Sequence, residues 1–334
     1  MKCIRVVLYG MACCFPLLCS LSSYANECAR WPGHGAKKSA IVHAALTEYA
    51  SFNGHRIDVR GRLWKFGATE TENEALLDPE TGEPTAAVPN RLAWRRVWEY
   101  WLTLDKHVAG EAMSRKVLTY EGALEDNMTD AGRKETRLSE LFSVLAQVSP
   151  DRADSLRQAA VRAALSDSPW SAAFISYVMH QAGLDGDQFR YAAAHWQYVK
   201  QAFGSAPRYA YRACDPRDTS PSEGDLLCYS RGELAPKDFA AWRAAVNLPG
   251  FSAASHCEIV VMVDRAANKI ETIGGNVLQS VAMRRLMLNK DGLLSAAHYL
   301  DRGARRLSRA CVEDKTCRQS DLNAQRWSVL LQLR

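Results

Sequence analysis

The sequence contains none of the short motifs that mark metal or nucleotide sites. It has no His-Glu-x-x-His and no Cys-x-x-Cys, the usual ligand spacings of catalytic and structural zinc. It also has no glycine-rich loop that could cradle phosphates. We therefore expect neither a metal nor any other cofactor.

A strong charge imbalance and a membrane-length apolar run are also missing. The formal net charge is +5, and it falls to +3 without Lys2 and Arg5, which is too mild to favour nucleic acid as a partner. The apolar run of residues 6–18 is too short for a comfortable membrane span. We expect no nucleic-acid partner and no stable membrane insertion.

The N-terminus has the features of a secretory signal peptide. Lys2 and Arg5 precede the run of residues 6–18, and Ser23-Tyr24-Ala25 offers small residues for cleavage. Residues 1–25 are therefore predicted to be a signal peptide. The mature protein should be soluble and exported, periplasmic or extracellular.

Cysteine is sparse in the mature chain. Cys19 could suggest a lipid anchor, but the bulky Leu18 precedes it where a small residue is expected. Six cysteines remain after removal of the signal peptide, and an even set in an oxidising compartment indicates disulfides. Cys311 and Cys317 are close enough to pair, and Cys257 is expected in a disulfide or in the core. The six are Cys28, Cys214, Cys228, Cys257, Cys311 and Cys317.

The hydrophobic pattern changes from helical to strand-like near Pro221. Apolar spacing predicts helices over residues 39–52, 91–104, 138–145, 151–165, 187–203 and 238–246. It predicts strands over residues 226–229, 256–264, 269–273, 276–288 and 327–333. Loops are expected at residues 67–90 and 109–137. We expect an α+β protein with a helical region at residues 26–165 packed on a domain at residues 166–334.

A tryptophan stripe marks the second of these helices. Trp94, Trp98 and Trp101 share one helical face, which favours core packing, although tryptophans at the mouth of a cleft can also stack on sugars.

The stretch Ser168-Pro169-Trp170-Ser171 reads as the start of a further, buried helix. Ser168 can serve as the N-cap and Pro169 as the first helical residue, which places Ser171 in the first turn. Backbone N–H groups there lack helical partners, and the helix dipole favours negative charge. Ser171 is either a nucleophile or a serine that only helps to cap the helix.

Two downstream residues complete a candidate acyl-transfer site. His256 begins a strand and could take the proton of Ser171, and Asn276 after two glycines could orient that histidine. Period two places Glu258 and Val260 on the face of His256, with Cys257 opposite. Trp170, His195 and Glu258 are candidate substrate contacts, although a lone histidine such as His195 is more often a packed residue.

Three segments resemble, in order, the motifs of CHAP amidases, a branch of the papain-like peptidases related to NlpC-type cell-wall hydrolases. They are Pro169-Trp170-Ser171-Ala172-Ala173-Phe174, Ser222-Glu223-Gly224-Asp225-Leu226, and His256-Cys257-Glu258-Ile259 with Gly274-Gly275-Asn276. Two segments, residues 168–176 and residues 274–281, resemble more closely still the bacterial domain-of-unknown-function family numbered 2272.

The resemblance implies a papain-like helix packed on an antiparallel sheet, with Ser171, His256 and Asn276 as nucleophile, base and orienting residue. It implies peptidoglycan peptides or related amides as substrates. CHAP enzymes use cysteine where this chain has Ser171, and an alcohol depends more heavily than a thiol on its base and oxyanion hole. Two functions follow: a peptidoglycan amidase or peptidase with a Ser-His-Asn site, or an inactive CHAP-like module that binds cell-wall fragments or a protein partner.

Overall fold

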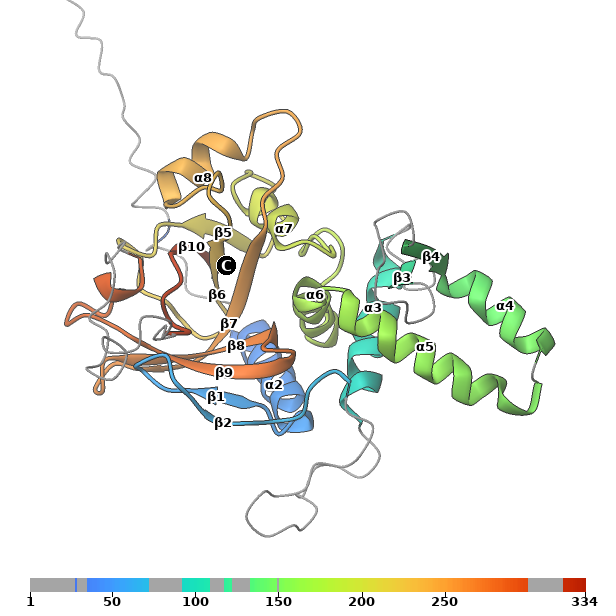
Figure 1. The fold of residues 1–334 in the computed structure, drawn as a ribbon. Coiled ribbons are helices and arrows are strands. Elements are labelled where there is room, and N and C mark those ends of the chain that lie inside the picture. The colour runs from blue at the N-terminus through green and yellow to red at the C-terminus, as the bar shows by residue number, and fades with distance from the viewer. Residues whose placement is uncertain are drawn as a thin grey trace, which may run out of the picture.

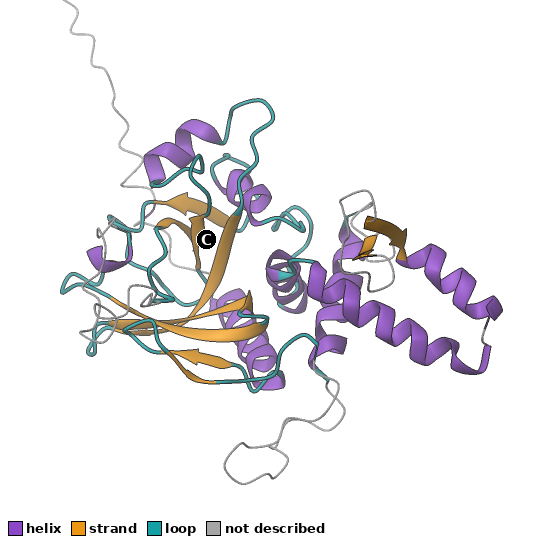
Figure 2. Cartoon of the chain, viewed as in Figure 1, coloured by secondary structure: helices purple, strands orange, loops and turns teal. Residues whose placement is uncertain are grey.

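The computed structural model describes residue 28 and residues 35–71, 92–108, 117–121, 133–148, 150–299 and 321–334. The chain forms a mixed α+β fold, with most strands gathered in one half of the molecule and the α3–α5 helices extending from it (Figure 2). The expected signal peptide and the expected Cys311–Cys317 pair lie outside the described residues.

The main sheet has eight strands in the order β2-β1-β9-β8-β7-β6-β10-β5. Their bounds are β1 His55–Ile57, β2 Leu63–Lys65, β5 Tyr211–Cys214, β6 Leu226–Ser230, β7 Ser255–Asp264, β8 Lys269–Val277, β9 Ser280–Met287 and β10 Trp327–Leu333. The sheet is mixed rather than antiparallel, because β1 runs parallel to β9 and the other pairs are antiparallel. Strands from both ends of the chain thus complete it, while the predicted boundary at residue 165 stays a prediction.

Helices α2, α6, α7 and α8 pack against strands of this sheet, whereas α3, α4 and α5 extend away from it (Figure 1). Their bounds are α2 Gly35–Ser51, α3 Ala93–His107, α4 Leu138–Val148, α5 Ala153–Asp167, α6 Ser171–Gln181, α7 His195–Ala202 and α8 Phe239–Ala245, with short 3-10 turns η4 Pro150–Arg152 and η5 Ala296–His298. Helix α6 is almost wholly buried between α3 and strands β7 and β8. Its Phe174, Ile175 and Val178 belong to the largest apolar cluster.

The two faces of β7 enter different cores, as alternation predicts for its first half. Cys257 and Ile259 pack on the helical side, whereas Val260 joins a second cluster around Leu227 and Trp327 on the other side. A register shift between Val260 and Met262 interrupts the alternation. Val263 therefore packs against the second cluster, on the face of Val260 rather than opposite it.

The tryptophan stripe of α3 packs in the core. Trp94, Val97 and Trp101 are buried, and Trp98 is half-buried against the same cluster. Part of the loop expected at residues 109–137 is instead a two-stranded antiparallel sheet of β3 Val117–Glu121 and β4 Arg133–Arg137. Backbone pairing supplies this order, which the polar sequence did not reveal.

Several elements differ from the sequence expectation. The helix predicted over residues 187–203 begins only at His195, because turns occupy the preceding residues. Strand β5 was not predicted. Strand β8 runs on through Gly274 and Gly275, which lie close to Glu258 and to Phe174, respectively.

Two disulfides join distant parts of the fold. Cys28 pairs with Cys214 at the end of β5, and Cys228 pairs with Cys257 across β6 and β7. The expectation of at least one disulfide, and of a buried role for Cys257, is confirmed. Within the described ranges, no helix combines the length and the apolar character needed to cross a membrane.

Candidate functional site

Helix α6 begins at Ser171 without a side-chain cap. Trp170 is its N-cap, and the hydrogen bond from Phe174 N to Trp170 O opens the helical series. Ser168, expected as N-cap, is the C-cap of α5, because that helix runs on to Asp167 and leaves only two residues for the turn. The N–H groups at the start of α6 therefore remain without a capping side chain, in the positive end of the helix dipole.

Ser171 is hydrogen-bonded to a histidine. Its Oγ lies 2.7 Å from Nε2 of His195, the first residue of α7. Ser171 is half-buried, whereas His195 is 3% exposed. The two helix starts thus place a hydroxyl and an imidazole in direct contact, 24 residues apart in sequence.

Tyr198 binds the other side of the same imidazole. Its hydroxyl is hydrogen-bonded to Nδ1 of His195, one helical turn earlier on α7. Burial, with smaller effects from His256 and the Arg231 charge, holds the pKa of His195 well below its usual value. The ring is therefore neutral near pH 7, which is the form that can accept a proton.

His256 lies beneath His195 and is wholly buried rather than at a cleft lip. Their ring centroids are 5.1 Å apart. No hydrogen bond within the described structure joins His256 to Ser171, and neither nitrogen of its ring has a hydrogen-bond partner there. Burial lowers the pKa of His256, while Glu258 opposes the shift.

Glu258 connects His256 to a buried cation. Its Oε1 lies 3.4 Å from His256 Nε2 and 3.0 Å from a guanidinium nitrogen of Arg284, and Thr272 donates to its Oε2 at 2.5 Å. Burial would raise the pKa of Glu258, but Arg284 and His256 outweigh that effect and lower it to about 2. Glu258 is thus a buried anion inside the sheet, wholly shielded from solvent.

Asn276 lies near the end of β8 and is half-buried, with a backbone φ of 54°. No hydrogen bond in the described ranges links its amide to His256. Trp170 is fully buried between Phe52 and Tyr100, with ring centroids 5.9 and 5.8 Å away. The structure therefore brings Ser171 and His195 together and places His256 with Glu258 behind them.

The Ser171–His195 contact could not be predicted from the sequence pattern. His195 had been expected as a substrate contact on the interior of a longer helix, where it would have had no special position. In the structure α7 begins at His195, so this histidine lies at a helix N-terminus, as Ser171 does. The partnership with Tyr198 follows from helical spacing, since residues three apart share a face.

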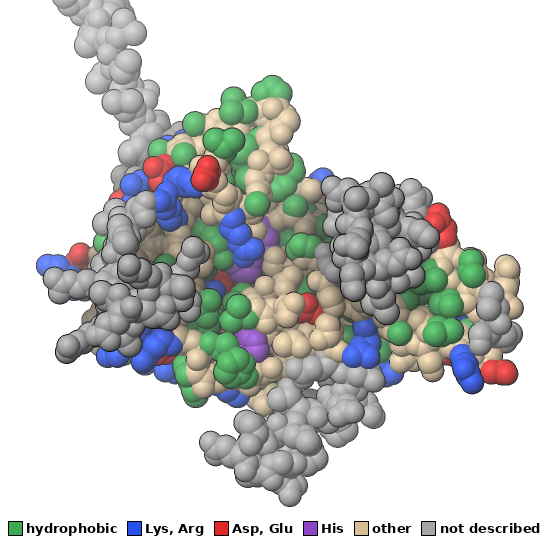
Figure 3. Space-filling model, in the orientation of Figure 1, with side chains coloured by type: hydrophobic (Ala, Val, Ile, Leu, Met, Phe, Trp, Pro, Cys, Tyr) green, Lys and Arg blue, Asp and Glu red, His purple; other side chains and the backbone are tan. Residues whose placement is uncertain are grey.

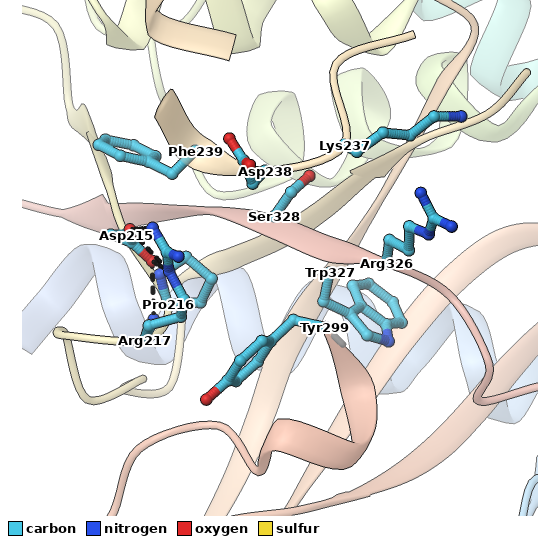
Figure 4. A pocket seen from close by; sticks show the side chains of 10 residues that line it. All are labelled: Asp215, Pro216, Arg217, Lys237, Asp238, Phe239, Tyr299, Arg326, Trp327 and Ser328. Carbon is cyan, nitrogen blue, oxygen red and sulfur yellow. Dashed lines mark hydrogen bonds and ion pairs between the residues drawn. The ribbon is translucent and has the colours of Figure 1, made fainter. Parts of the chain in front are cut away.

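A row of rings leads from the site to an open cavity. His256 lies 5.4 Å from Tyr229, and Tyr229 lies 4.9 Å from Trp327, between ring centroids. Trp327, Tyr299 and the Asp215–Arg217 ion pair line a cavity of about 190 Å³ beside the start of α8 (Figure 4). Neither Ser171 nor His195 is among the residues that line this cavity.

On the face shown in Figure 3, histidine atoms reach the surface in a hollow beside a cationic side chain and apolar neighbours.

The described residues contain no group of three or more His, Cys, Asp or Glu side chains suited to hold a metal ion.

Comparison with known proteins adds a family. A family model described as "Uncharacterized protein conserved in bacteria (DUF2272)" matches residues 89–333, which is more than half of the chain. Neither the curated proteins nor the solved structures gave a match.

Proposed function

We propose that this chain, which belongs to the DUF2272 family of bacterial proteins, is an exported serine-type hydrolase of amide or ester bonds. Ser171 is its nucleophile and His195 its base. The observation that carries the proposal is the 2.7 Å contact between Ser171 Oγ and His195 Nε2 at the uncapped start of α6. His195 takes the place that the sequence pattern gave to His256, and Tyr198 the orienting place given to Asn276.

The proposed reaction follows from these contacts. Nε2 of His195 accepts the Ser171 proton as Oγ bonds to the substrate carbonyl carbon, and the first N–H groups of α6 stabilise the resulting oxyanion. His195 then gives the proton to the leaving amine or alcohol, and water releases the acyl group by the same sequence. For this, the His195 Nδ1 proton must point to the oxygen of Tyr198.

The substrate class rests on resemblance. The order of the Ser171, Glu223-Gly224-Asp225 and His256 segments is similar to that of CHAP amidases, so we propose a papain-like cleft and peptidoglycan peptides as substrates. The buried α6 packed on β7 and β8 is compatible with that arrangement. The two disulfides support a periplasmic or extracellular location, because disulfides persist in oxidising compartments.

One observation favours the second candidate, a CHAP-like module that binds wall fragments or a protein partner without turnover. Among the described residues, the hydroxyl of the buried Tyr198 has His195 Nδ1 as its one hydrogen-bond partner. If the Tyr198 O–H donates, the His195 proton sits on Nε2 and Ser171 becomes the acceptor. In that tautomer His195 cannot take the Ser171 proton.

A fluorophosphonate probe separates the two candidates. It phosphonylates an activated serine and releases fluoride, so the wild type should gain one label, located at Ser171 by peptide mass spectrometry. Ser171→Ala and His195→Gln should lose the label. Ser166→Ala, at an exposed serine in the last turn of α5, should keep it. Turnover of defined muropeptides, read by mass spectrometry, should follow the same pattern.

Ser171→Cys tests the geometry independently of the alcohol. A thiol at a helix N-terminus beside a histidine should have a lowered pKa and react with iodoacetamide at least about tenfold faster than an ordinary cysteine. A wild type inert to both probe and muropeptides, together with an unreactive thiol in Ser171→Cys, would exclude the hydrolase and leave the binding module.

A further inference from the structure

Arg231 lies at the end of the β6–β7 strand pair that holds His256. It follows directly after β6, and its backbone N–H donates to Ala254 O at 2.7 Å. Its guanidinium carbon lies 5.4 Å from the centroid of the Tyr229 ring, and Nη2 donates to the Tyr229 hydroxyl at 3.2 Å. The side chain is thus exposed to solvent but held over an aromatic ring.

The Tyr229 ring connects Arg231 to the candidate site. Tyr229 lies 5.4 Å from His256, and His256 lies 5.1 Å from His195, measured between ring centroids. Burial is the main cause of the lowered pKa of both His195 and His256, and the positive charge of Arg231 adds a smaller effect in the same direction. The charge of Arg231 therefore acts on both histidines of the site.

Arg231 differs from the other arginines held near the core. Arg284 is paired with Glu258, and Arg96 is paired with Glu48. Arg231 has no carboxylate within ion-pair distance in the described part of the chain. Its bond to Tyr229 uses one of five guanidinium N–H donors, which leaves donors for a planar anion.

We infer that Arg231 binds a carboxylate of the substrate next to the bond that Ser171 attacks. The substrate class is then acyl compounds with a free carboxylate close to the reacting carbonyl, such as acidic peptides. Guanidinium and carboxylate form paired hydrogen bonds of matched geometry, which lysine does not reproduce. This inference rests on the proposed function for its catalytic part, but the binding of the carboxylate does not.

Two esters test the catalytic part. The wild type should hydrolyse mono-p-nitrophenyl glutarate in preference to p-nitrophenyl acetate. In Arg231→Gln the ratio of the two kcat/KM values should fall at least about tenfold, the loss expected for hydrogen bonds to a charged group. In Arg231→Lys the ratio should lie between the values of the wild type and Arg231→Gln. The matched control is Arg243→Gln, whose guanidinium lies 4.8 Å over the Phe239 ring, and its ratio should not change.

Calorimetric titration with glutarate tests binding without turnover. Ser171→Ala should bind glutarate, and Ser171→Ala/Arg231→Gln should bind it at least about tenfold more weakly. If neither ester is hydrolysed but Arg231 controls glutarate binding, the hydrolase proposal fails and the carboxylate site stands. An unchanged ester ratio in Arg231→Gln, or equal glutarate binding by the two proteins, overturns the inference.

Discussion

Two buried carboxyl groups have pKa values shifted in opposite directions, depending on their partners. Glu258 is held as an anion by Arg284, with a pKa of about 2. Glu70 is 1% exposed, and its Oε2 has no hydrogen-bond partner. Burial raises the pKa of Glu70 to about 7, against backbone and Trp170 contacts that lower it. A buried carboxyl without a cationic partner thus holds its proton up to about pH 7, whereas one paired with an arginine stays charged.

Glu70→Gln should therefore change the pH dependence of stability. The unfolded chain releases the Glu70 proton above its ordinary pKa of 4.5, while the folded protein holds it to about 7. The wild type consequently loses stability as the pH rises through this window, and a glutamine does not titrate.

Urea unfolding should show Glu70→Gln gaining on the wild type by on the order of 2 kcal/mol between pH 5 and pH 8. Glu223→Gln, at a half-buried carboxylate that pairs with Lys38, is the comparison. A constant difference between wild type and Glu70→Gln at the two pH values would contradict the raised pKa.

Two adjacent glycines of β8 leave room for different neighbours on the two faces of the strand. A Cβ on Gly275 would lie 2.5 Å from the Phe174 Cβ, on the helical side of the strand. A Cβ on Gly274 would lie 2.7 Å from Glu258 Cγ and 3.0 Å from His256 Nε2, on the other side. Close approach therefore positions α6 against one face and the His256–Glu258 pair against the other.

Alanine at these positions should separate packing from site geometry. Gly275→Ala should lower the free energy of unfolding by about 1–3 kcal/mol, because it overpacks α6. Gly274→Ala should also displace His256 and slow fluorophosphonate labelling of Ser171. Gly186→Ala is the control, since a Cβ there meets nothing within 4 Å. Wild-type stability and labelling in both variants would show that the close contacts are not rigid.

At the scale of the whole molecule, strands from both ends of the chain close one sheet. Near the N-terminus, β1 pairs with β9, and at the C-terminus β10 lies between β5 and β6. Cys28–Cys214 ties residues 186 positions apart and belongs to the second apolar cluster. Long-range closure of this kind lowers the entropy of the unfolded chain.

Replacing Cys28 and Cys214 together by serine should lower the free energy of unfolding by roughly 2–5 kcal/mol. Denaturant unfolding under non-reducing conditions measures the loss. Peptide mapping without reductant should recover Cys28–Cys214 and Cys228–Cys257 as linked peptides. Recovery of these four cysteines as free thiols would contradict both bridges.

The sequence by itself determined the elements with strong periodicity. The helices around residues 39–52 and 91–104 and strands β6, β7 and β10 follow local patterns of apolar side chains, which depend on few partners. The helix after Ser171 was found for the same reason, because its apolar residues recur at helical spacing, although its N-cap was wrongly placed at Ser168.

Only the tertiary structure decided which histidine meets Ser171. His195 and His256 are both downstream of Ser171, and spacing along the chain contains no information on which ring reaches the start of α6. The turns before α7 and the packing of Gly274 determine that choice, since they set His195 at 2.7 Å from Ser171 and His256 behind it. The parallel pairing of β1 with β9 was equally invisible, because a strand of three residues has too few side chains to show a period.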